Sequence, residues 1–303
     1  MKVFLFTHIS DIDGLNNVVL AKQAFEQVDY VLCEADGIDE QIEKRNKLFA
    51  EYDYVFVTDL CPNEATLSLI NNSDLKYKFK VFDHHKGALD QISNHYEFVT
   101  IRIENTKGLC SGTSLFYEYL VDNKYLIPNL TLDRMVELTR KYDTWEWKET
   151  NELEARDLTW LFYACGIDEY LTIVSNKLVN DCFVLDDSDY AKINKWKNEF
   201  DLKIKKIVDE MMFIEVEGYK AGIVKTIYEY RNDVAEYIRE NKYDIDFLAL
   251  VFIDNESVSY RSIKDDVDVN EIAKKYGGKG HVKAASSPIT EEEKNNIIEY
   301  FMK

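Results

Sequence analysis

The chain has 303 residues, of which 46% are hydrophobic and 13% are aromatic, and its formal net charge is −19. This length and this apolar content are sufficient for two domains with separate cores. The negative charge argues against a protein that binds along a long nucleic acid, because such binding requires many phosphates to be neutralised. It is compatible with an acidic metal site and with a small polyanion held in a local basic pocket.

The five cysteines form no C-x-x-C pair and show no zinc-type spacing, so we interpret them as reduced thiols that pack in the interior. The apolar run at 3–6 is too short for a signal peptide, and no run has the length of a transmembrane helix. We therefore expect a cytoplasmic protein without a membrane partner. The sequence is compatible with a homodimer but does not determine the oligomeric state.

Strand and helix patterns alternate through the first hundred residues. Short β-type runs at 3–6, 30–33, 54–58 and 78–82 are separated by helical patterns at 15–28, 38–52 and 63–71. This order predicts a parallel sheet with right-handed crossovers, as in Rossmann-like α/β domains. A further strand is expected at 97–103, followed by a helix from Ser111, as N-cap, to about 122 and another at 132–142.

The pattern changes after residue 184. A polar acidic break at 186–189 is followed by a Lys-rich helical run at 190–212, which we interpret as an interdomain connector. A shorter α+β pattern follows, with strands at 213–216, 221–225, 247–253 and 257–263 and helices at 233–241, 269–276 and 291–302. The sequence thus predicts a catalytic α/β domain at 1–185, a helical linker at 186–206 and a smaller α+β domain at 207–303.

Acidic and imidazole side chains follow three of the predicted strands. The first strand is followed by His8, Asp11 and Asp13, the third by Asp59, and the fourth by Asp83, His84 and His85, while Asp143 ends a later helix. Because the carboxyl ends of parallel strands meet at one edge of a sheet, we expect these groups to come together. Successive residues that leave a strand point in opposite directions, so the two adjacent histidines should have different roles.

A set of carboxylates and imidazoles without thiolates favours Mn²⁺ over structural zinc, with Fe²⁺, Co²⁺ and Mg²⁺ as alternatives. The candidates are numerous enough for two metal ions that share a carboxylate, and sites of that kind serve in-line displacement at phosphorus. Taken singly, each residue has an ordinary interpretation as a turn, capping or surface group. Their joint occurrence at places that the topology brings together favours a metal centre.

Five segments resemble the motifs of a known family. The segments 7–14 (THISDIDG), 57–59 (VTD), 83–85 (DHH) and 142–143 (YD) resemble the four metal motifs of the DHH phosphoesterase superfamily. The segment 277–285 (GGKGHVKAA) resembles the glycine-rich signature of the C-terminal domain associated with that family. Within the superfamily, the whole set is most similar to the nano-RNase and oligoribonuclease type.

The resemblance implies a role for each matching residue. The first metal would be held by His8, Asp11 and Asp59, and the second by Asp13, Asp59, His84 and Asp143, so that Asp59 bridges the two. His85 would face the phosphate, and Asp83 would orient the adjacent imidazole. The residues that would bind the substrate are Arg261, Gly278, Gly280 and His281.

Three segments also suggest anion binding on physical grounds. The glycines at 277, 278 and 280 would let backbone N–H groups approach an anion, and a tight loop between helices is the alternative interpretation. Arg261 could hold a phosphate with its planar guanidinium, or could be an ordinary exposed strand residue. The amides that follow Ser111 could bind phosphate at the start of a helix, or that serine could simply cap the helix.

Together, the residues and the resemblance predict a metal-dependent phosphodiesterase that acts on short oligonucleotides or small nucleotides. A 3′,5′-bisphosphate nucleotide phosphatase and a cyclic mononucleotide or dinucleotide phosphodiesterase are alternatives of the same class. A metal-dependent nucleotide-binding protein without turnover is the alternative from another class, and it is disfavoured because no motif lacks a ligand. A long duplex nucleic acid is not expected as a partner.

Overall fold

The computed structural model describes residues 1–180, 182–216 and 218–289. The chain forms two compact units, Met1–Trp196 and Lys197–Lys303, and their boundary lies within the long helix α10 (Asp187–Asp209). Within the described ranges, no helix is long and apolar enough to cross a membrane. The helix predicted at 291–302 lies outside the described residues, and the functional assignment of the two domains stays a prediction.

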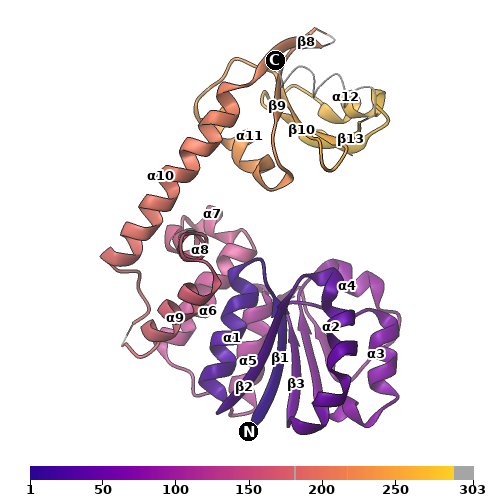
Figure 1. Cartoon of the computed structure of the whole chain (residues 1–303), viewed down its shortest axis with the longest axis vertical. Helices are drawn as coiled ribbons and strands as arrows, with labels where there is room; N and C mark the ends of the chain where they lie inside the picture. Colours follow the sequence, from indigo (N-terminus) through magenta and orange to yellow (C-terminus); the bar gives the residue numbers. More distant parts are fainter. Residues whose placement is uncertain (181, 217, 290–303) are drawn as a thin grey trace. The chain divides into compact units, whose positions relative to one another are not determined.

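The first unit is built around a parallel sheet in which the strands lie in the order β2-β1-β3-β4-β5 (Figure 1). Its strands are β1 (Lys2–His8), β2 (Gln27–Cys33), β3 (Tyr54–Thr58), β4 (Phe79–Asp83) and β5 (Val99–Ile101). The helices between and after them are α1 (Ile12–Ala24), α2 (Ile38–Arg45), α3 (Glu64–Asn71), α4 (Lys86–Gln91), α5 (Gly112–Asp122) and α6 (Leu130–Asp143). A short hairpin of β6 (Glu104–Asn105) and β7 (Gly108–Leu109) precedes α5, and α7 (Glu146–Thr150), α8 (Leu153–Cys165) and α9 (Ile167–Lys177) complete the unit.

Helices cover both faces of this sheet (Figure 1). Alternate residues of each strand point to opposite faces, so each strand contributes apolar side chains to two cores. On β1, Val3 and Leu5 join the core formed with α1, α5 and α6. Phe4 and Phe6 join the core formed with α2 and α3 on the other face. With both faces packed, the carboxyl edge is the part of the sheet where polar side chains can gather.

The predicted order of strands and helices is confirmed, but several boundaries differ. The helix predicted at 15–28 ends at Ala24, and Val28 instead pairs with Val3 as part of β2. The predicted break at 186–189 is largely the start of α10, since the Asp186 carboxylate accepts the backbone N–H groups of Ser188 (2.9 Å) and Asp189 (3.2 Å). The sequence assigned no elements to the region of α7, α8 and α9.

The second unit contains a mixed sheet in which the strands lie in the order β12-β13-β11-β10-β9-β8. The strands are β8 (Met212–Val216), β9 (Tyr219–Lys225), β10 (Phe247–Phe252), β11 (Ser257–Ser262), β12 (Lys279–His281) and β13 (Ala284–Pro288). One face packs against α11 (Arg231–Glu240) and the end of α10, and the other packs against α12 (Val269–Lys275). The predicted fold class, an α/β domain followed by a smaller α+β domain, is therefore confirmed.

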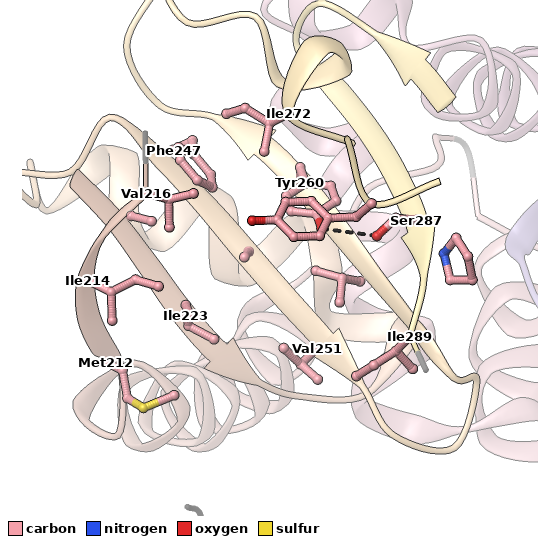
Figure 2. A pocket seen from close by; sticks show the side chains of 15 residues that line it. Met212, Ile214, Val216, Ile223, Phe247, Val251, Tyr260, Ile272, Ser287 and Ile289 are labelled. Carbon is pink, nitrogen blue, oxygen red and sulfur yellow. Dashed lines mark hydrogen bonds between the residues drawn. The ribbon is translucent and has the colours of Figure 1, made fainter. Parts of the chain in front are cut away.

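An apolar pocket of about 220 Å³ lies on the α12 face of this second sheet. Figure 2 shows Ile214, Phe247, Tyr260 and Ile272 among the side chains that line it. Tyr260 Oη and Ser287 Oγ are 3.0 Å apart and share a hydrogen bond. None of the described lining residues is charged, so the pocket offers no group that could neutralise a phosphate.

Candidate active site

The side chains that the sequence placed at the strand ends come together at the carboxyl edge of the first sheet. Three overlapping groups have potential ligand atoms within 4.8 Å of one another: His8, Asp11 and Asp59; Asp13, His84 and Asp143; and Asp59, Asp83, His84 and His85. Asp59 and His84 each belong to two groups and so connect them. The structure thus gathers all eight predicted residues of the first unit, whereas their individual roles stay predictions.

Asp59 lies at the centre of this cluster in an unusual backbone conformation. Its φ of 60° is in the left-handed region, and its backbone N–H donates to the Phe82 carbonyl (2.8 Å). Such a conformation costs about 1–3 kcal/mol at a residue other than glycine and is typical of functional sites. Close packing maintains it, because a Cβ atom built on Gly112 would lie only 2.5 Å from Asp59 Cβ.

The Asp59 carboxylate lacks the partners that a buried charge requires. Its side chain is 2% exposed, and its Oδ2 atom has no hydrogen-bond partner among the described residues. Burial, together with the charges of Asp13, Asp11 and Asp143, raises the pKa of Asp59 well above its ordinary value. A buried oxygen without a donor, surrounded by further carboxylates, fits a site made for cations.

His84 completes the inner part of the cluster. Its Nε2 atom lies 3.2 Å from Asp59 Oδ1, 3.5 Å from Asp143 Oδ2 and 3.6 Å from Asp13 Oδ2. Burial lowers the pKa of His84, which favours the neutral imidazole that metals bind. Burial and the charges of Asp13 and Asp11 raise the pKa of Asp143 to about 8. The shift of Asp143 reflects an excess of acidic groups that a divalent cation would relieve.

Asp13 is held by the start of α5. Its two carboxylate oxygens accept the backbone N–H groups of Gly112 (2.6 Å) and Thr113 (2.9 Å). The positive end of a helix stabilises a carboxylate in this position. These backbone N–H groups are therefore occupied by Asp13 and are not free to bind a phosphate. The alternative interpretation of Ser111 as a helix cap is the one observed, since Ser111 and Ser114 form a reciprocal capping box.

Asp83 orients the second histidine of the DHH segment. Asp83 Oδ1 accepts from His85 Nδ1 (2.7 Å) and from the backbone N–H groups of His84 (2.7 Å) and His85 (3.2 Å). The hydrogen bond to Asp83 raises the pKa of His85 and assigns the Nδ1 proton. The His85 side chain is 56% exposed, which leaves its Nε2 atom for another partner. The two histidines thus differ in environment, as the strand geometry predicted.

Glu34 is a candidate that the sequence analysis missed. It follows β2, and its Oε2 atom lies 3.1 Å from His8 Nε2. Its other oxygen accepts from Ser10 Oγ. His8 Nδ1 in turn lies 2.6 Å from Asp11 Oδ2, and this hydrogen bond is the largest cause that raises the pKa of His8 to about 9. Glu34 occupies the same kind of strand-end position as the predicted ligands, so the same rule could have found it.

The predicted substrate-binding residues belong to the second unit. Arg261 on β11 pairs with Ala284 on β13, and Ala284 pairs with His281 on β12. Residues directly opposite in antiparallel strands project from the same face, so Arg261 and His281 flank the small side chain of Ala284. The strand pairing therefore brings two of the four predicted residues to one face of the sheet.

Part of the glycine-rich segment, Lys279–His281, forms strand β12. A Cβ atom on Gly278 would lie 2.1 Å from the Ser286 carbonyl oxygen, and one on Gly280 would lie 2.3 Å from Ala285 Cα. These two glycines are thus required for β12 to pack against β13, and the alternative of a tight loop between helices is wrong. Their proposed contact with an anion stays a prediction.

Comparison with known proteins places this arrangement in a family. No family model matches the chain. Oligoribonuclease NrnB of Bacillus subtilis (strain 168) is 32% identical over 294 residues, which cover 95% of this chain and 73% of that protein. The fold and the clustered strand-end residues define the class, a DHH-type phosphoesterase. Within that class, the chain belongs to the family of oligoribonuclease NrnB, and the expected family and enzyme class are confirmed.

A solved structure supports the fold independently. The pGpG-specific phosphodiesterase PggH of Vibrio cholerae matches with a TM-score of 0.53 and 15% sequence identity, over 99% of this chain and 97% of that chain. At this identity the match concerns the fold alone. It covers nearly the whole of both chains, so the similarity is not limited to one of the two units.

Proposed function

We propose that this protein hydrolyses phosphodiester bonds of short oligonucleotides with two divalent cations, preferably Mn²⁺, bound at the carboxyl edge of the first sheet. Membership in the family of oligoribonuclease NrnB supports the substrate class. The observation that carries the proposal is the position of the buried Asp59 carboxylate. Its Oδ2 atom has no hydrogen-bond partner among the residues that the structure describes and lies 3.7 Å from His8 Nδ1, while its Oδ1 atom lies 3.2 Å from His84 Nε2. One carboxylate thus faces both groups of candidate ligands.

The two cations would share that carboxylate. One would be held by His8, Asp11 and Asp59, and the other by Asp13, Asp59, His84 and Asp143. A donor set of carboxylates and imidazoles without thiolates suits Mn²⁺ and similar ions. When bound, two such ions supply the positive charge that in-line displacement at phosphorus requires.

The residues of the chain would perform the remaining tasks. His85 would hold a proton at Nε2 and donate it as a hydrogen bond to a non-bridging phosphate oxygen, where negative charge accumulates during displacement. Asp83 would favour the protonated form of this imidazole and hold its orientation through the 2.7 Å bond to Nδ1. Because His85 is half exposed, it can reach a substrate that the buried His84 cannot contact as freely.

A panel of substrates tests this proposal directly. The full chain would be assayed with Mn²⁺ against an RNA dinucleotide, adenosine 3′,5′-bisphosphate, a cyclic dinucleotide and an aryl phosphodiester, with EDTA as the metal-free control. We expect the dinucleotide to give the highest kcat/KM and EDTA to abolish turnover. A tenfold preference for the bisphosphate or for the cyclic dinucleotide would overturn the assigned substrate class. Nucleotide binding without any turnover would indicate a binding protein instead.

A further inference from the structure

Trp145 lies between α6 and α7 in a conformation that a tryptophan rarely adopts. Its φ of 64° is in the left-handed region, where the Cβ atom of any residue other than glycine is crowded. The residue is also 59% exposed, although a tryptophan gains much from burial. Both features cost stability, and a glycine at this position would avoid them. Strained backbone of this kind is concentrated at functional sites, as it is at Asp59.

Along the chain, Trp145 lies next to the metal cluster. Asp143, a candidate ligand whose Oδ2 atom lies 3.5 Å from His84 Nε2, ends α6, and Trp145 follows two residues later. Two residues span at most about 7 Å, so the Cα atoms of Asp143 and Trp145 lie within that distance of each other. The backbone N–H of Trp145 donates to the Tyr142 carbonyl (3.1 Å), which makes the turn tight. The chain thus places an exposed indole at the rim of the proposed active site.

Neighbouring residues hold the backbone of this turn in place. Arg140 donates to both carboxylate oxygens of Glu146, over 2.9 Å and 2.8 Å. The ring of Trp147 is stacked on that of Tyr142, with 6.0 Å between the ring centres and 14° between the ring planes. The start of α7 is therefore anchored to the end of α6 by these two contacts. The exposed ring of Trp145 is not required for this anchoring, so its presence needs another explanation.

Lys148 covers one face of the exposed indole. Its Nζ atom lies 4.6 Å from the centre of the Trp145 ring and 5.4 Å from that of the Trp147 ring. A cation over one face attracts the ring and fixes its orientation, and the other face stays available for a second partner. Nucleobases are suitable partners, because proteins that bind single strands stack the bases on exposed aromatic rings.

We propose that Trp145 stacks on the nucleobase next to the scissile phosphodiester, so that the first unit recognises a base as well as the phosphate. The inference rests on the proposed function, since the metal cluster defines where the phosphodiester lies. Lys148 is the positioning residue that holds the indole for this contact. The strain and the exposure of Trp145 are then the loss of stability that a preformed stacking surface requires. Every base has a π-face, so the contact should tolerate any base.

Trp145→Gly separates a binding role from a structural role. Glycine adopts a left-handed φ without strain, so the Tm of the variant should stay close to that of the wild type. Loss of one stacked base should raise the KM for an RNA dinucleotide about 5- to 100-fold, and Trp145→Phe should restore part of the affinity.

Tyr77→Ala is the matched control for the loss of an exposed ring. Tyr77 is 71% exposed, has Lys76 Nζ 5.1 Å from its ring centre and precedes β4, at the opposite edge of the sheet. Its removal should leave the KM unchanged. A wild-type KM in Trp145→Gly, or a large loss of Tm in that variant, would overturn the proposal.

A second comparison tests whether the ring acts on the base. ApA and two analogues that each lack one adenine would be assayed with the wild type and with Trp145→Gly. Removal of the stacked base should cost the wild type about as much as removal of the ring, and the variant should lose little more, because the two changes delete the same contact. An equal loss from base removal in both proteins would show that Trp145 acts on the geometry of the site, and would contradict the assignment.

Fluorescence distinguishes a failure of this inference from a failure of the proposed function. A dinucleotide with a methylene phosphonate linkage, which resists hydrolysis, would be titrated into the full chain with Mn²⁺. The stacked base should quench part of the tryptophan emission, and Trp145→Phe should remove this quenching. If quenching depends on Trp145 but no phosphodiester is cleaved, the proposed function fails and the inference stands. If dinucleotides are cleaved and Trp145→Phe is quenched like the wild type, the inference fails and the proposed function stands.

Discussion

Gly112 lies directly against Asp59. A Cβ atom at position 112 would be 2.5 Å from Asp59 Cβ and 2.8 Å from its Cα, and the backbone N–H of Gly112 donates to Asp13 Oδ2 (2.6 Å). One residue at the start of α5 thus positions two candidate metal ligands that come from different strand ends. The absence of a side chain at Gly112 is what allows the helix to approach so closely.

Gly112→Ala should therefore impair the metal centre without unfolding the unit. The new methyl group must displace Asp59, and a displacement of about 1 Å in an active site can cost on the order of 100-fold in rate. We expect Mn²⁺ affinity, measured by calorimetry, and kcat to fall together. Gly87→Ala is the matched control, because Gly87 lies in α4 and a Cβ added there would meet no atom within 4 Å. Normal Mn²⁺ binding by Gly112→Ala would contradict the packing argument.

Asp59→Asn tests the shared carboxylate itself. A neutral amide cannot offer a charged oxygen to each of two cations, so turnover should fall by several orders of magnitude. The stabilisation that Mn²⁺ adds to the wild type, seen as a rise of Tm with metal concentration, should largely disappear. His95→Ala should change neither property, since His95 is exposed and lies outside every motif. Near-normal Mn²⁺-dependent activity of Asp59→Asn would show that the site is misassigned.

The sequence could predict the strand-end ligands because their signal is local. His8, Asp59 and Asp83 each come at the end of a short apolar run. The carboxyl ends of parallel strands meet at one edge of a sheet, so these residues could be expected to lie together. Glu34 also follows such a run, but its contact with His8 depends on β2 lying beside β1. Strand order and register, here His8 opposite Cys33, are tertiary properties that a local pattern does not contain.

The other differences between the predicted and the observed elements also arise from tertiary contacts. Val28 continues the helical period of α1, yet pairing with Val3 draws it into β2. Gly278 and Gly280 indicate a loop by composition, but both lie in close contact with β13, and Gly280 belongs to strand β12.

Glu34→Gln should weaken the metal centre moderately. Glu34 holds the Nε2 side of His8, and loss of such a supporting partner typically costs about 10- to 100-fold in metal affinity or activity. Glu43→Gln is a suitable control, because it removes one charge from an exposed position of α2. Titration of both variants with Mn²⁺ would measure the effect. An affinity equal to that of Glu43→Gln would mean that Glu34 does not support His8.

A chain of residues 1–196 should keep its metal affinity and lose most of its nucleotide affinity. All proposed metal ligands lie in the first unit, whereas the predicted substrate-binding residues Arg261 and His281 lie in the second. Calorimetry with Mn²⁺ and then with AMP would measure both properties on one sample, after circular dichroism has established that the fragment is folded. Retained AMP affinity would assign nucleotide binding to the first unit and contradict the predicted roles of Arg261 and His281.

Substrate length should be limited by the charge of the protein. At a net charge of −19, the protein should repel a polyanion except near the proposed cations and the basic groups around Arg261, and Lys283 adds little there because it is paired with Asp265. Each further phosphate outside these places adds repulsion rather than affinity from released counterions. RNA of about two to five nucleotides should therefore be cleaved with a higher kcat/KM than a strand of about 24, and added salt should narrow the difference by screening. A time course with the three lengths at two salt concentrations would measure this, with duplex RNA expected to be nearly inert. A preference for the longest strand at low salt would show that the acidic surface does not set length, and would favour a processive exonuclease.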